Sequence, residues 1–288
     1  MQMSRKQKIL VTGGAGFVGS HLCERLSSDE SNEVFSLDNY FTGSEDNHVS
    51  NVTYINGETL DISKHIKFKP DIVYHLGEYS RVEQSFDDIE LVWRYNNVSI
   101  LSVLEFVRKS NCKLIYAGSS TKYANYADFD SGSPYSWTKA KNTELVVNYG
   151  NWFGLDYAIT YFYNVYGPRE IANGKYATLI ALFSEKIKEN KPLTVVSPGE
   201  QFRNFTHVDD IVDGLLLVGK HGKGDEYGIG HHEKFTILEV AQLFGGKIDM
   251  LPERKGNRMT AEVITEKIIA LGWEPKHNLK DYINSLKY

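Results

Sequence analysis

A run of glycines between residues 13 and 19 constrains the fold of this chain more than any other feature of its sequence. The run follows Ile9–Val11, a short apolar stretch that is typical of a fully buried strand. After it, Val18, Leu22 and Leu26 recur every four residues with polar positions between them, which indicates a helix packed on a sheet. The segment therefore predicts a strand, a tight turn and a helix that begins at the turn.

The spacing of Gly14, Gly16 and Gly19 matches the dinucleotide-binding fingerprint. In that pattern the missing side chains allow the tight turn, the approach of the backbone to a pyrophosphate, and close packing of helix on strand. Asp38 ends the next predicted strand, 19 residues beyond Gly19, where a carboxylate can accept hydrogen bonds from a ribose. Because no Lys or Arg occurs between residues 36 and 48, we expect NAD to bind rather than NADP.

Composition excludes several classes of protein. With 288 residues the chain can bury a large core, and its net charge of −5 offers no basic surface to nucleic acid or an anionic membrane. Cys23 and Cys112 are too few for a disulfide framework or a metal cluster, so we expect buried thiols and no metal site. No apolar stretch reaches the roughly 18 residues of a membrane span, and no leader pattern precedes the first strand. These features favour a cytoplasmic protein without nucleic-acid or membrane partners.

Strands and helices alternate through the first half of the chain, which predicts an α/β fold with a doubly wound parallel (Rossmann) sheet. The predicted strands lie near residues 8–12, 33–38, 52–56, 71–76, 112–118 and 155–163. Long helical patterns cover 85–109 and 134–150. We expect residues 1–164 to form an NAD-binding domain to which 204–222 returns, and residues 165–203 and 223–288 to form a smaller C-terminal substrate-binding domain that caps the crevice at the strand ends.

Three residues near the fifth strand form a candidate catalytic group. Ser119 ends that strand, and Tyr135 and Lys139 follow on a predicted helix at a spacing of four, which brings their side chains to one face. A tyrosine is a poor base at neutral pH, but a nearby ammonium favours the phenolate. We therefore expect Lys139 to make Tyr135 an effective acid and base.

Further motifs run along nearly the whole chain, namely Thr12–Gly19, Asp38-Asn39, His75-Leu76-Gly77, Asn97-Val98, Ser119, Tyr135 with Lys139, Asn164–Pro168, Arg203–Asp210 and Leu271–Trp273. Together they resemble the extended short-chain dehydrogenase/reductase family, specifically its NAD-dependent nucleotide-sugar epimerase/dehydratase group. The resemblance implies an enzyme whose Ser119 and Tyr135 hold a sugar hydroxyl, while Lys139 tunes Tyr135 and binds the nicotinamide ribose. It also implies a homodimer formed through the helices at 85–109 and 134–150.

The resemblance implies contacts to cofactor and substrate, residue by residue. The cofactor residues are Gly13, Gly16, Phe17, Val18, Gly19, Asp38, Asn39, Glu58, Thr59, Leu76, Gly77, Asn97, Tyr135 and Lys139. The residues for a nucleotide-diphosphate sugar are Ser119, Ser120, Asn164, Arg203 and Arg254. Either Glu58 or Asp61 meets the adenine, and the ungapped register favours Glu58.

Departures from the family pattern narrow the expected reaction. Ser120-Thr121 stands where family dehydratases carry an Asp-Glu pair, and Arg169 stands where the 3,5-epimerases carry a His. Glu78 occupies a position where a small residue is common. We therefore expect NAD-dependent oxidoreduction at the 4-hydroxyl, as in a nucleotide-sugar 4-epimerase. The alternatives are a 4-dehydrogenase or 4-reductase acting on a hexose or heptose nucleotide, and a non-enzymatic NAD-binding regulator.

Overall fold

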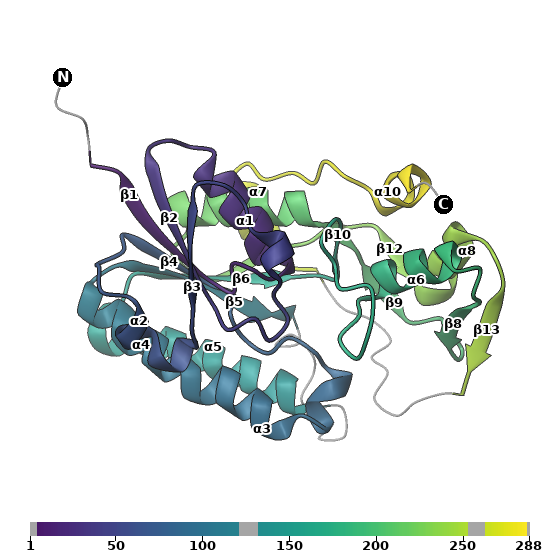
Figure 1. Cartoon of the computed structure of the whole chain (residues 1–288), viewed down its shortest axis with the longest axis horizontal. Coiled ribbons are helices and arrows are strands. Elements are labelled where there is room, and N and C mark those ends of the chain that lie inside the picture. Colours follow the sequence, from purple (N-terminus) through teal and green to yellow (C-terminus); the bar gives the residue numbers. More distant parts are fainter. Residues whose placement is uncertain (1–4, 121–131, 253–262, 287–288) are drawn as a thin grey trace.

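A seven-stranded parallel sheet forms the centre of the molecule (Figure 1). The computed structural model describes residues 5–120, 132–252 and 263–286. The strands lie in the order β11-β6-β5-β4-β1-β2-β3 and every neighbouring pair is parallel. Their bounds are β1 (Gln7–Thr12), β2 (Asn32–Asp38), β3 (Val52–Asn56), β4 (Ile72–His75), β5 (Lys113–Ser119), β6 (Tyr157–Phe162) and β11 (Gly224–Ile229). The predicted doubly wound sheet is confirmed, and its order reverses between β1 and β4.

Helices cover both faces of this sheet (Figure 1). One face packs on α1 (Phe17–Ser27) and α7 (Val208–His221), and the other packs on α4 (Ser99–Ser110) and α5 (Pro134–Phe153). Short helical segments complete this unit: η1 (Glu45–Asn47), η2 (Thr59–Asp61), α2 (Ile62–His65), η3 (Glu83–Phe86), α3 (Ile89–Val92), η4 (Trp93–Val98) and α9 (Glu266–Ala270). Both faces therefore exclude water, as the apolar β1 sequence predicted.

The two long predicted helices form with small differences. Residues 89–110 are helical through α3, the π-helical η4 and α4, but η3 is a separate 3₁₀ turn before them. The helix α5 begins at Pro134, and the Ser133 hydroxyl accepts a hydrogen bond from the Ser136 amide at 3.1 Å. Gly154 ends the helix in the left-handed conformation. These end signals fix where Tyr135 and Lys139 stand on the helix.

A second, smaller unit has its own core, formed by Ile180, Phe183, Leu193, Val240 and Ile283 among others. It contains α6 (Leu179–Lys188), α8 (Ile237–Phe244) and α10 (Leu279–Ser285). Three two-stranded sheets accompany them: β7 (Val165–Tyr166) with β10 (Thr206–His207), β8 (Leu193–Val196) with β13 (Ile248–Leu251), and β9 (Phe202–Asn204) with β12 (Lys234–Thr236). No helix among the described residues is long and apolar enough to cross a membrane.

The expected domain boundary at residue 223 is wrong. Residues 224–229 form β11, the edge strand of the large sheet next to β6. Ile268 and Trp273 are buried in the core between that sheet and α7, and the Trp273 indole donates a hydrogen bond to the Asp210 carbonyl at 2.8 Å. β11 carries acidic residues beside glycines, so its sequence does not show the apolar run of a buried strand. The C-terminal segment thus contributes to both units.

Candidate active site

A cavity of about 770 Å³ follows the carboxyl ends of the central strands and reaches the smaller unit, where Thr194, Val196, Phe205 and Ile237 line it. It brings together most of the residues that the sequence singled out. These are Gly13, Gly16, Phe17, Val18, Gly19, Asp38, Asn39, Thr59, Leu76, Gly77, Ser119, Ser120, Tyr135, Lys139, Asn164 and Arg203. The cavity thus lies across the point where the strand order reverses, the usual place for a ligand in such a sheet.

The glycine turn at the cavity floor cannot accept side chains. Gly13 has φ +74°, and a Cβ there would lie 2.9 Å from the Gly77 Cα. A Cβ on Gly19 would lie 2.0 Å from the Gly13 carbonyl oxygen. Gly16 precedes α1 and gives it no side-chain cap, so the first amides of the helix are open to an anion at the cavity. This backbone cradle fits the pyrophosphate of a dinucleotide.

Asp38 anchors the same turn at the end of β2. Its carboxylate accepts hydrogen bonds from the Ala15 amide at 2.9 Å and the Tyr40 amide at 2.8 Å. Burial raises the pKa of this carboxyl, and the two amide hydrogen bonds act against that rise. Asp38 and Asn39 both line the cavity, so an acid stands where the ribose hydroxyls of NAD were expected.

The two candidates for the adenine-side acid lie outside the cavity lining. One oxygen of each carboxylate contacts a cation: the Arg94 guanidinium donates to Glu58 Oε2 at 2.7 and 2.9 Å, and the Lys64 ammonium lies 2.8 Å from Asp61 Oδ1. Thr59, which lies next to Glu58, does line the cavity. The choice between Glu58 and Asp61 stays a prediction.

Asn97 is another predicted cofactor residue that is absent from the described cavity lining. Its Oδ1 is buried without a hydrogen-bond partner among the described residues. The preceding residue, Asn96, accepts a hydrogen bond from the Tyr79 amide at 2.8 Å and donates to Thr138 Oγ1 at 3.0 Å. Asn96 therefore holds the loop after β4 against α5, a role that the sequence did not reveal.

The candidate catalytic residues meet where β5 ends and α5 begins. Ser119 is the last residue of β5, Tyr135 is in the first turn of α5, and Lys139 follows one turn later. All three line the cavity, although the Lys139 side chain is only 6 % exposed. The Lys139 ammonium donates hydrogen bonds to the Ala117 carbonyl and to the carboxylate of Glu78. The sequence had marked Glu78 only as a departure from the family pattern.

Two further charged residues line the cavity and were not predicted from the sequence. Arg81 is mostly buried and donates from Nε to the Tyr176 carbonyl at 3.0 Å. Glu170 accepts a hydrogen bond from the Gly167 amide at 3.0 Å, and its other oxygen is buried with no partner among the described residues. Burial raises the pKa of Glu170 to about 7. Arg81 lies in the loop after β4 and Glu170 in the loop after β7, and a charged residue shortly after a strand end is the signal that could have found them.

The arginines expected to meet substrate differ in their surroundings. Arg203 belongs to β9 and lines the cavity, together with Asn164, whose amide donates to the Asn204 carbonyl at 2.9 Å. Arg169, noted in the sequence only because the 3,5-epimerases carry a His at its position, forms an ion pair with Glu24 on α1, with 2.7 Å between charged atoms. Arg254 lies outside the described residues.

Comparison with known proteins agrees with this geometry. The model of the "NAD dependent epimerase/dehydratase family" matches residues 9–230. UDP-glucuronic acid decarboxylase 5 of Arabidopsis thaliana is 29 % identical over 95 % of this chain and 86 % of its own length. A putative UDP-glucose 4-epimerase of Methanocaldococcus jannaschii is 29 % identical over 96 % of this chain and 95 % of its own length.

Solved structures extend the likeness to the whole fold. The UDP-glucose 4-epimerase of Thermotoga maritima, solved with UDP-glucose, superposes with a TM-score of 0.89 at 26 % identity and covers 97 % of both chains. The Thermus thermophilus UDP-glucose 4-epimerase, solved with NAD, has a TM-score of 0.86 at 26 % identity and also covers 97 % of both chains. The chain therefore belongs to the NAD-dependent epimerase/dehydratase family, within the extended short-chain dehydrogenases/reductases, and is an NAD-dependent enzyme.

Proposed function

We propose that this enzyme is a nucleotide-sugar 4-epimerase. The observation that carries the proposal is the grouping of Ser119, Tyr135 and Lys139 beside the glycine cradle in one cavity. The cradle and Asp38 would hold NAD, which when bound would supply a hydride acceptor and donor at the sugar's C4. Tyr135 takes the proton of the 4-hydroxyl and later returns it, and Ser119 holds the sugar oxygen by a hydrogen bond. Lys139 stabilises the phenolate by its charge.

We propose a nucleotide-diphosphate sugar as the substrate, with Arg203 and Asn164 as ligands of the diphosphate, Ser120 near the sugar, and Arg254 in the same role as Arg203. A guanidinium suits this role because its planar donors can bind two phosphate oxygens at once. The smaller unit supplies Arg203 and covers that end of the cavity. Support also comes from a UDP-glucuronic acid 4-epimerase of Bacillus cereus, solved with UDP-glucuronic acid and NAD, which is 26 % identical with a TM-score of 0.86.

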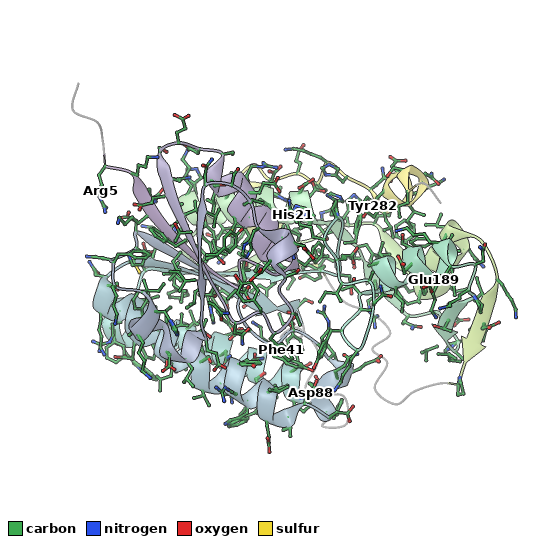
Figure 2. The ribbon with its side chains drawn as sticks, in the orientation of Figure 1. Arg5, His21, Phe41, Asp88, Glu189 and Tyr282 are labelled. Atoms are coloured by element: carbon green, nitrogen blue, oxygen red, sulfur yellow. The ribbon has the colours of Figure 1, made fainter. Side chains whose placement is uncertain are left out.

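Contacts across the cavity favour the 4-epimerase over a 4-dehydrogenase or 4-reductase. Tyr176 and Lys175 both reach Asp88, at 2.8 and 2.7 Å, and Gln84 donates to the Lys175 carbonyl at 2.9 Å. Phe41 packs against Tyr176 with ring centroids 5.2 Å apart. Figure 2 labels Phe41 and Asp88. These contacts join residues 84–88 to residues 175–176 at one side of the cavity and restrict opening there. An epimerase regenerates NAD within each cycle and benefits from a closed site, whereas a dehydrogenase must exchange its cofactor.

The test is to incubate the purified enzyme with a panel of nucleotide sugars in heavy water and to examine the products by NMR. We expect a C4 epimer that carries no deuterium on carbon, because the hydride that leaves C4 returns to it. A released 4-keto sugar with bound NADH would instead support the 4-dehydrogenase, and binding without turnover would support the regulator. Deuterium at C3 or C5 would contradict chemistry confined to C4 and point to one of the glutamates of the described cavity lining, which are Glu78, Glu83 and Glu170.

We propose that the enzyme forms a homodimer through α3, η4, α4 and α5. Apolar side chains are exposed along these helices, among them Trp93, Leu101, Trp137 and Trp152, and in the preceding η3, where Phe86 is 62 % exposed. Trp93 stacks on Trp137 with ring centroids 5.7 Å apart. A contiguous apolar surface of this kind marks a protein interface.

A charge on that surface tests the dimer. Trp93→Glu should convert a dimer into a monomer in sedimentation velocity, because an unpaired carboxylate at an apolar interface is costly. Met250→Glu, at an exposed apolar residue of the smaller unit, is the matched control and should leave the dimer intact. A parent protein that sediments as a monomer at all concentrations would refute the proposed assembly.

A further inference from the structure

Glu78 is a buried carboxylate that is contacted by side chains from β4, β5 and α5. It follows β4, and its side chain is only 4 % exposed. The Asn142 amide donates to one oxygen and the Tyr116 hydroxyl to the other, each at 3.0 Å. The Lys139 ammonium donates to the second oxygen as well, and His75 Nε2 lies 3.7 Å from the first. A carboxylate can be buried in this way only when a charge and several hydrogen bonds compensate it.

This environment keeps Glu78 ionised. Burial alone favours the neutral acid, but the charge of Lys139, together with His75, outweighs burial and lowers the pKa of Glu78 to about 2. The groups that face Glu78 come from three elements: His75 from β4, Tyr116 from β5, and Lys139 and Asn142 from α5. Among these described neighbours, Lys139 is the residue whose positively charged group donates a hydrogen bond to the Glu78 carboxylate.

Glu78 also limits what Lys139 can do. A lysine ammonium has three donors, and Glu78 and the Ala117 carbonyl take two of them. The ammonium lies 4.5 Å from the centroid of the Tyr116 ring, which fixes its position from a further side. The cation that acts on Tyr135 is therefore held in one place and is partly neutralised by an anion in contact with it.

We propose that Glu78 is a positioning residue that holds Lys139 beside Tyr135 and weakens its field, and so sets the pH at which Tyr135 becomes an effective base. The proposal rests on the proposed roles of Tyr135 and Lys139. A negative charge near a phenol opposes phenolate formation, so the carboxylate makes the working pH higher than Lys139 alone would set. A small residue at this position would leave the ammonium uncompensated.

The test compares Glu78→Gln with the parent enzyme over a range of pH. Gln keeps the shape and an acceptor oxygen for Lys139 but removes the negative charge. We expect the acid limb of the kcat/KM profile to move to lower pH by about one unit. Glu78→Asp retains the charge and should keep the limb near that of the parent. Glu105→Gln, which removes a carboxylate paired with Arg108 on α4, is the charge-matched control and should move nothing.

A second readout does not depend on turnover. The ultraviolet absorbance of tyrosinate, measured as the difference between each protein and its Tyr135→Phe counterpart, reports ionisation of Tyr135 in the folded protein. It should shift in the same direction in Glu78→Gln, even if the substrate or the reaction differs from the proposed one. Unshifted titration and an unshifted acid limb in a folded Glu78→Gln protein would overturn the proposal. Should Glu78→Gln fail to fold, Glu78→Ala takes its place, and failure of both would make Glu78 a purely structural residue.

Discussion

Replacing Tyr135 by Phe should lower kcat by about a thousandfold while NAD stays bound. The phenol oxygen is the proposed proton acceptor, and the remaining ring keeps the packing of the first turn of α5. The effect falls on kcat more than on KM, because the hydroxyl acts chiefly in the transition state. Steady-state kinetics on the nucleotide sugar that is turned over, with bound cofactor measured after denaturation, gives both quantities.

Tyr227→Phe is the matched control for this substitution. Tyr227 lies on β11, and its hydroxyl interacts with the backbone of Lys223, away from the described cavity lining. The control should keep the parent turnover. A Tyr135→Phe protein with parent-like kcat would remove Tyr135 from the mechanism, and one that also lost NAD would show that the change reaches the cradle.

Replacing Glu170 by Gln should stabilise the protein strongly at pH 8 and much less at pH 5. Burial raises the pKa of Glu170 from an ordinary value of 4.5 to about 7 in the folded state. The folded chain therefore binds a proton that the unfolded chain releases between these values. The contribution of the protonated Glu170 carboxyl to the free energy of unfolding is therefore fully present below pH 4.5. It is lost as the pH rises through 7.

The size of the effect follows from the same difference in pKa. One pKa unit corresponds to about 1.4 kcal/mol, and the pKa rises by about 2.5 units, so Gln should raise the free energy of unfolding at pH 8 by about 3 kcal/mol. Urea unfolding at pH 5 and pH 8 measures it. Glu144→Gln, at an exposed position on α5, is the control. A Glu170→Gln protein no more stable than the parent at pH 8 would show that the carboxylate finds compensation in the folded state.

The parts of the fold that the sequence predicted are those that local patterns encode. An apolar run before a glycine turn specifies β1, and the pair Ser133-Pro134 specifies where α5 begins. Tyr135 and Lys139 then follow from helical spacing alone. In each case the information lies within a few residues of the feature that it determines.

The parts that the sequence missed depend on contacts between distant segments. β11 carries no strand pattern and is a strand because β6 offers it an edge. Glu78 reads as an exposed charge until α5 places Lys139 and Asn142 around it. Glu170 is unusual only because the cavity wall buries it. Pattern reading assigns charged residues to the surface, so it fails at the few positions where tertiary structure buries them.

The path of the chain has a consequence for how the protein is made. The edge strand β11 and the buried Trp273 both complete the NAD-binding unit, yet several elements of the smaller unit, from β7 to β10, are translated before either of them. A nascent chain that has reached β10 therefore exposes the open edge of β6 and the face of the sheet that α7 and Trp273 later cover. An open edge can pair with other chains. Nascent copies are thus vulnerable to aggregation at this edge until β11 has been synthesised.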